Sequence, residues 1–222
     1  MKCPRVAVLV RILLVAASGA LIASACTDDD NGANSSGGTD VEGAFLEAMI
    51  PHHESAVEMA RLAKRRARHR KITELADAII EAQSNEIRQI GRIHRRLFGQ
   101  KVLPNGDAHQ GLGLSAEQAG MAHDDPAAEL ARARRFDRVF IDEMIDHHQG
   151  AIRMARAVLD QTEGEELRSL ANAIVSAQSE EIERMNRWRT AWYGVPSPSG
   201  DVPAEAGRPG DSDEEHEGGH TG

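Results

Sequence analysis

Apolar residues recur every three or four positions through the middle of the chain, which is the spacing of amphipathic helices. Two such segments cover about residues 39–70 and 72–98, and two more cover about 125–160 and 165–193. Gly99 and Gly194 stand where the second and fourth segments should end. The short separations within each pair predict two antiparallel hairpins, and therefore an all-α, four-helix domain over residues 39–194.

Two local signals predict where helices begin. Thr39 and Glu42 have the spacing of a capping box, so the first helix should start at Thr39. Asp125 followed by Pro126 is a cap with proline at the first helical position. We therefore expect the third helix to run without a break from Pro126 to about Asp160.

The two halves of this pattern are similar in sequence at an offset of 95 residues. Residues 45–60 and 140–155 are identical at eight of sixteen positions, which include the doublets His52-His53 and His147-His148. Farther along, Ala-Gln-Ser-Asn-Glu-Ile at 82–87 returns as Ala-Gln-Ser-Glu-Glu-Ile at 177–182. We infer a duplicated two-helix unit, with repeat one at 41–99, a crossover at 100–125 and repeat two at 136–194.

The first 25 residues have the composition of a signal peptide. Basic residues precede an apolar run at 12–22, which is short for a membrane-spanning helix and is followed by small residues. Leu-Ile-Ala-Ser-Ala-Cys at 21–26 is similar to a bacterial lipobox, so Cys26 becomes the first mature residue and the lipidation site. A secreted protein with a free thiol is the alternative. We expect an exported protein, anchored by lipid to the cell membrane and facing outside the cytoplasm, in the periplasm or at the cell surface.

The segments that flank the helical domain should have no fold of their own. Residues 26–38 are acidic and rich in Gly and Ser, which predicts a flexible tether, and the proline-rich, acidic residues 195–222 predict a disordered tail. These ends account for most of the formal net charge of −9, because residues 41–194 hold 24 acidic and 22 basic side chains. Such a balance is not that of a nucleic-acid-binding protein.

Helical projections place each histidine doublet at the edge of an apolar stripe, and Glu86 and Glu181 within the stripes of the partner helices. A buried carboxylate needs a proton, a donor or a cation, and histidine from the adjoining helix is the simplest partner. Either the pairs only set the helix register, or they bind a metal ion. The candidate metal-site residues are His52, His53, Glu86, His147, His148, Glu181, Met49, Met59, Met144 and Met154, with Gln83 and Gln178 as neighbouring amides.

The motif Met-Ile-x-His-His-x-x-Ala-x-x-Met-Ala, followed by Ala-Gln-x-x-Glu-Ile, resembles the bacterial family known as domain of unknown function 305. The resemblance covers about residues 40–99 and 125–194. It implies an extracytoplasmic, ferritin-like antiparallel four-helix bundle, often duplicated or lipidated. Members of the family are linked to copper binding and have no well-defined general activity.

The candidate ligands favour copper. Ferritin-like di-iron sites use four carboxylates and two Glu-x-x-His pairs, whereas this chain offers two central glutamates, four histidines and four methionines. Iron, zinc and manganese are the alternative ions. Ser-His-Asp, phosphate-loop and CxxC patterns are absent from the sequence, so hydrolase, nucleotide and thiol-redox functions have no support.

We therefore expect a protein that sequesters or relays copper and is not primarily an enzyme. A ferritin-like metal-dependent oxidase is the first alternative, and a structural or interaction bundle with buried His–Glu pairs and no metal is the second. The sequence leaves homo-oligomerisation open.

Overall fold

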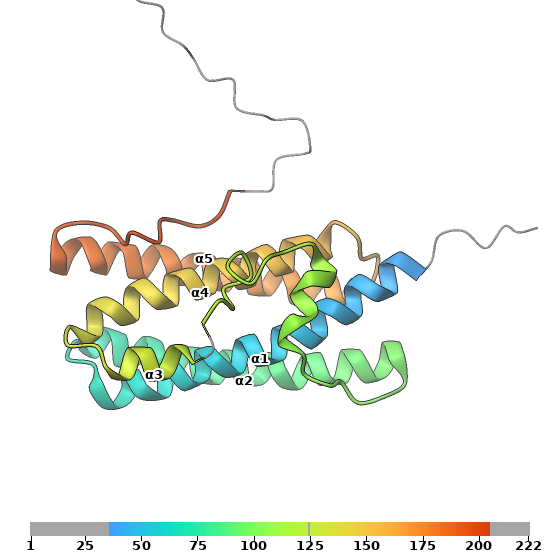
Figure 1. Cartoon of the computed structure of the whole chain (residues 1–222), viewed down its shortest axis with the longest axis horizontal. Helices are drawn as coiled ribbons and strands as arrows, with labels where there is room; N and C mark the ends of the chain where they lie inside the picture. Colours follow the sequence, from blue (N-terminus) through green and yellow to red (C-terminus); the bar gives the residue numbers. More distant parts are fainter. Residues whose placement is uncertain (1–35, 124, 205–222) are drawn as a thin grey trace, which may run out of the picture. The chain divides into compact units, whose positions relative to one another are not determined.

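The computed structural model describes residues 36–123 and 125–204. Within these residues every regular element is a helix and no strand occurs, which confirms the all-α prediction. The elements in Figure 1 are α1 (Ser36–Arg66), α2 (Arg70–Phe98), the 3₁₀ helix η1 (Gly106–Leu112), α3 (Pro126–Ala131), α4 (Phe136–Leu159) and α5 (Glu165–Tyr193). The predicted signal peptide, most of the tether with Cys26, and residues 205–222 lie outside the described residues.

The long helices pair in sequence order. α1 packs along α2 and α4 packs along α5, while α1 and α4 also pack against each other and join the two pairs (Figure 1). The contacts between α2 and α5 are sparse. The crossover contributes η1, which lies against α1. The centre of the α1–α4 interface is therefore where residues of the two sequence halves meet.

The glycine stops are confirmed. Gly99 and Gly194 have φ angles of 71° and 85°, a left-handed conformation that glycine adopts without strain. Their backbone N–H groups donate to the carbonyls of Arg95 and Thr190, which satisfies one free carbonyl at each helix end.

The predicted start of the first helix is wrong. α1 begins at Ser36, three residues before Thr39. The Glu42 carboxylate accepts a hydrogen bond from the Thr162 hydroxyl, in the α4–α5 turn, instead of capping its own helix. A contact with a residue 120 positions away thus uses the group that a local pattern assigned to the cap.

The third helix is interrupted, contrary to the prediction of one helix from Pro126 to Asp160. Asp125 does cap α3, because its side chain accepts from the N–H of Ala128, but α3 ends at Ala131 and α4 begins at Phe136. The guanidinium of Arg66 donates to the carbonyls of Ala131 and Ala133. These carbonyls bond to another part of the chain, so the break is a tertiary effect.

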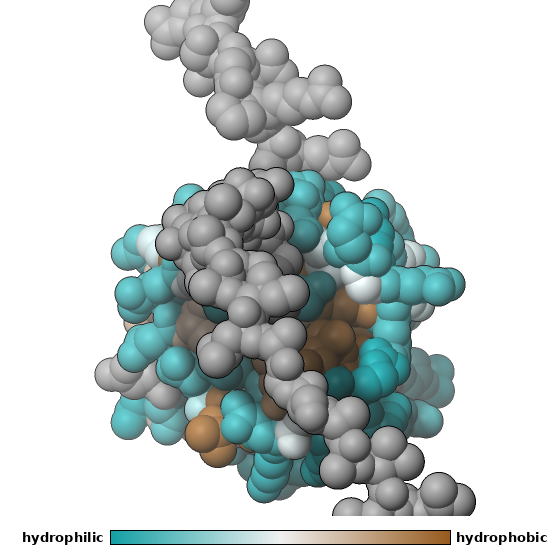
Figure 2. Space-filling view, turned by 90° about the vertical axis from the view of Figure 1, so that its right-hand side faces the viewer, coloured by the Kyte–Doolittle hydropathy of each residue, from teal (hydrophilic) through white to brown (hydrophobic). Residues whose placement is uncertain are grey.

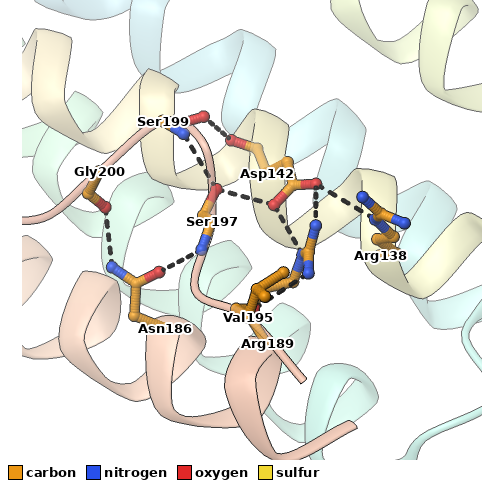
Figure 3. Close-up of polar contacts among 8 residues, drawn as sticks. All are labelled: Arg138, Asp142, Asn186, Arg189, Val195, Ser197, Ser199 and Gly200. Atoms are coloured by element: carbon orange, nitrogen blue, oxygen red, sulfur yellow. Dashed lines mark hydrogen bonds and ion pairs between the residues drawn. The ribbon is translucent and has the colours of Figure 1, made fainter. Parts of the chain in front are cut away.

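The prediction of disorder from residue 195 is wrong for residues 195–204, which lie against α4 and α5 (Figure 3). The Ser197 hydroxyl donates to Asp142 Oδ1 at 2.7 Å, and the Asn186 amide donates to the Gly200 carbonyl at 2.7 Å. The buried guanidinium of Arg189 donates to Asp142 at 3.0 Å and to the Val195 carbonyl at 3.1 Å. Side-chain hydrogen bonds therefore hold a segment whose composition alone predicts disorder.

Two clusters of buried apolar side chains form the core. Met49 and Met154 belong to one cluster, and Met59 and Met144 belong to the other. Each cluster thus combines methionines of both sequence halves. The end of the helical unit seen in Figure 2 shows hydrophobic residues recessed among hydrophilic ones. None of the described helices is both long enough and apolar enough to cross a membrane.

Candidate metal centre

The imidazole rings of His52 and His147 meet where α1 crosses α4. Their centroids are 3.8 Å apart and their planes are tilted by 40°. Both side chains are buried, with 1% and 4% of their surface exposed. Because the two residues occupy the same position in the two sequence halves, this contact relates the two hairpins symmetrically.

In each hairpin a His–Glu pair flanks the rings of His52 and His147. His53 Nε2 lies 2.7 Å from Glu86 Oε2, and His148 Nε2 lies 2.7 Å from Glu181 Oε2. In the second hairpin the contact is a hydrogen bond, whereas in the first the atoms are equally close but not aligned as one. The structure thus brings each predicted glutamate to the second histidine of its own hairpin.

The four histidines of positions 52, 53, 147 and 148 form what we call the histidine layer. Burial lowers the pKa of His52 well below its ordinary value, and the neighbouring His147, His53 and His148 lower it further. Burial also lowers the pKa of His147, followed by the effects of His148 and His53. The two central rings are therefore neutral at physiological pH, and each keeps a nitrogen lone pair that can bind a metal ion.

Polar atoms without partners are concentrated in this layer. Both ring nitrogens of His52 and the Nδ1 atoms of His53, His147 and His148 are buried and form no hydrogen bond within the described residues. The side-chain amides of Gln83 and Gln178, each 3% exposed, are also unpartnered. A buried polar group without a partner costs about 1–3 kcal/mol. A bound ion would remove part of this cost by coordinating the imidazole nitrogens.

The side chains are not already arranged as a complete coordination sphere. Among the described residues, no three His, Cys, Asp or Glu side chains converge on one point. Adjacent rings of a doublet diverge, with centroids 6.1 Å apart for His52 and His53 and 6.4 Å apart for His147 and His148. The predicted ligand sets, each of two histidines and one glutamate, therefore remain a prediction. The nearest approach between imidazoles is across the two hairpins.

Methionine sulfurs lie in the core on both sequence halves. Met49, Met59, Met144 and Met154 are buried, at 0–1% exposure. Met49 and Met144 lie three residues before the first histidine of their doublet, and Met59 and Met154 lie seven residues after it. This helical spacing places each methionine on the same helix face as that histidine. Thioethers are soft ligands that suit Cu(I) and Ag(I).

Sequence reasoning missed a second pair of buried polar contacts. Arg189 donates to Asp142, and the equivalent residues of the first half, His94 and Glu47, lie 3.9 Å apart (His94 Nε2 to Glu47 Oε1). Both bases also contact the backbone carbonyl of the residue six positions later. His94 Nδ1 lies 3.2 Å from the Gln100 carbonyl, and Arg189 donates to the Val195 carbonyl at 3.1 Å. The 95-residue offset already aligned these acids and bases, and that alignment was the signal available.

A family model described as domain of unknown function (DUF305) matches residues 40–216 of the chain. The solved structure of CopM in the Cu(I)-bound form is 35% identical to this chain, with a TM-score of 0.59, and the match covers 69% of this chain and 98% of that one. CopM also matches in its apo, Ag-bound and Cu(II)-bound forms.

Two further solved structures have similar folds. A DUF305 fragment from Deinococcus radiodurans is 30% identical, with a TM-score of 0.58, over 68% of this chain and 96% of the fragment. A DUF305 protein from Streptomyces coelicolor is 22% identical, with a TM-score of 0.62, over 72% of this chain and 97% of that one. No curated protein matches the chain.

Proposed function

This chain belongs to the DUF305 family, and from that membership we propose that it binds copper in the histidine layer and sequesters or relays the ion. The observation that carries the proposal is the group of four buried imidazoles with unpartnered nitrogens. The similarity to CopM, a protein solved with Cu(I), Cu(II) and Ag, supports copper as the ion.

Each group in the layer has a separate role in this proposal. His52 and His147 are neutral because burial lowers their pKa, so a metal ion does not compete with a proton for their nitrogens. His53 and His148 are oriented by Glu86 and Glu181, whose carboxylates also offset the positive charge of an ion. The methionine sulfurs favour Cu(I) over Zn(II) and Fe(II).

We further propose that the helices form a ferritin-like bundle produced by duplication of one hairpin. The pairing of α1 with α2 and of α4 with α5 supports this topology. The equal His–Glu distances of 2.7 Å in the two halves support the duplication.

We also propose that the protein is exported and lipid-anchored through Cys26, so that the helical domain binds copper outside the cytoplasm. The lipobox-like sequence at 21–26 and the apolar run before it support this placement.

Metal selectivity tests the proposal. The purified full-length protein is equilibrated with Cu(I), Cu(II), Zn(II) or Fe(II), and the retained metal is measured after gel filtration. We expect copper to be retained by the wild type and lost when His52, His53, His147 and His148 are replaced by Ala. Oxygen consumption with Fe(II) would instead favour the oxidase. Retention of no metal would favour the structural alternative, for which the His148–Glu181 hydrogen bond already suffices.

A further inference from the structure

A basic cavity lies at the end of the helical unit where the α1–α2 turn, the start of α4 and the end of α5 come together (Figure 1). Two basic stretches of sequence, residues 64–71 and 132–135, meet there. The cavity has a volume of about 480 Å³. Its lining includes Arg66, Arg68, His69, Arg134, Arg135 and Asp137.

Asp137, the carboxylate among the described residues of the lining, forms no ion pair with these arginines. Asp137 is 4% exposed and accepts hydrogen bonds from the backbone N–H groups of Arg68 and His69, at 3.0 and 2.8 Å. Its Oδ2 also lies 2.6 Å from His69 Nδ1. Its lone pairs are thus directed to the start of α2 and to the His69 ring, not to the guanidinium groups.

Three of the arginines have no partner for their charge among the described residues. Arg68, Arg134 and Arg135 are exposed, and their guanidinium groups form no hydrogen bond or ion pair within the described part of the chain. Like charges gathered around a concave surface raise its potential and attract an anion. Lys64 and Arg70, in the same basic stretch as Arg68, do form ion pairs, with Asp77 and Glu74.

The walls of the cavity are held in place by contacts within the protein. Arg66 bonds to the carbonyls of the α3–α4 turn, and its guanidinium carbon lies 4.9 Å from the centre of the Phe136 ring. The His69 ring stacks on Trp192 with centroids 3.8 Å apart and planes 6° from parallel. The walls are therefore already in place, and binding has to order only the exposed arginine side chains.

We propose that this cavity binds a phosphate-bearing anion. Guanidinium groups match phosphate oxygens with paired hydrogen bonds, and three arginines around one cavity, unpaired within residues 36–123 and 125–204, supply several such donors. The volume is in the range of small-molecule sites, which suits an organic phosphate better than a bare ion. The phosphate can belong to a soluble phosphomonoester or to the headgroup of an anionic lipid.

Calorimetric titration of the full-length protein tests the site, with phenyl phosphate as the probe at low salt. The test variant is Arg134→Ala/Arg135→Ala, and the control is Arg88→Ala/Arg187→Ala, which removes the same charge from other exposed positions. We expect a dissociation constant below about 1 mM for the wild type. It should weaken by at least about tenfold in the test variant and stay within about twofold in the control.

Sedimentation of the Cys26→Ala protein, which lacks the proposed lipid anchor, with vesicles of phosphatidylcholine, alone or mixed with phosphatidylglycerol, distinguishes the two sources. Loss of binding to the mixed vesicles in the test variant and not in the control would assign a lipid headgroup. Saturable binding of phenyl phosphate without such loss would assign a soluble ester. The inference is overturned if the test variant alters neither kind of binding, or if the control variant weakens both to the same extent.

Discussion

The ring centroids of His52 and His147 lie 3.8 Å apart although 95 residues separate the two histidines in the sequence. His52 comes from α1 and His147 from α4, so each hairpin supplies one ring to the centre of the histidine layer. The two outer histidines each pair with a glutamate of their own hairpin at 2.7 Å. A metal ion at the centre would therefore draw ligands from both hairpins, and copper binding would tie the hairpins together.

The central histidines should reduce the stability of the metal-free protein. Replacing both by leucine, as His52→Leu/His147→Leu, removes unpartnered polar atoms and keeps a similar buried volume. We expect the metal-free variant to be more stable than the wild type by about 1–3 kcal/mol in urea unfolding. Added Cu(I) should raise the free energy of unfolding of the wild type and leave that of the variant unchanged. A less stable metal-free variant would show that the contact between the two rings stabilises the fold.

Acid should destabilise the metal-free protein through the same residues. Burial lowers the pKa of His52 and His147, so the unfolded chain binds more protons than the folded chain once the pH falls below about 6.5. Stability is therefore highest above that pH and declines below it, by at most about 1.4 kcal/mol per pH unit for each histidine. Urea unfolding between pH 5 and pH 8 measures the slope. The slope should be smaller in the double leucine variant, and an equal slope would exclude these residues as its cause.

Gly150 should be required for the crossover to approach α4. A Cβ at this position would overlap the carbonyl group of Ala119 and lie 2.5 Å from the nitrogen of Gly120. We expect Gly150→Ala to destabilise the protein by about 2–4 kcal/mol, because backbone rather than a flexible side chain must move. Gly91→Ala is the control, since no atom lies within 4 Å of its Cβ, and it should stabilise α2 by about 0.5–1 kcal/mol. Equal effects of the two changes would contradict the close approach.

Attachment to the membrane should depend on Cys26. We expect Cys26→Ala to move the protein from the membrane fraction to the soluble extracytoplasmic fraction, because the variant lacks the thiol to which a lipid would be attached. Fractionation of cells that express the wild type or the variant measures this. A wild-type protein that is already soluble outside the cell would contradict lipidation.

The contacts within one hairpin could be predicted from the sequence. Glu86 interrupts an apolar stripe, so the need for a partner pointed to a histidine of the adjoining helix, and the 2.7 Å pair with His53 satisfies that need. The same reasoning identified Glu181 and His148. Such contacts follow from helix periodicity and a short turn, both of which are local features.

Contacts between the hairpins could not be predicted in the same way. The contact between the rings of His52 and His147 depends on how α1 crosses α4, which no local pattern specifies. The break between α3 and α4 depends on Arg66, which lies in the other hairpin. The order of residues 195–204 depends on the half-buried carboxylate of Asp142 and the buried guanidinium of Arg189, which look like surface charges in the sequence.

Cu(I) affinity, measured by competition with a chromophoric chelator, tests most directly whether the histidine layer binds copper. The test variant is His52→Ala/His147→Ala, which removes the central pair of histidines. The control is His69→Ala/His123→Ala, which removes two histidines outside the layer. We predict a dissociation constant below about 1 μM for the wild type and the control. The His52→Ala/His147→Ala variant should bind Cu(I) at least about 100-fold more weakly, because it loses imidazole ligands. Two results would contradict copper binding at this layer. One is wild-type affinity retained in the His52→Ala/His147→Ala variant, and the other is a wild-type protein that binds Cu(I) no tighter than about 1 mM.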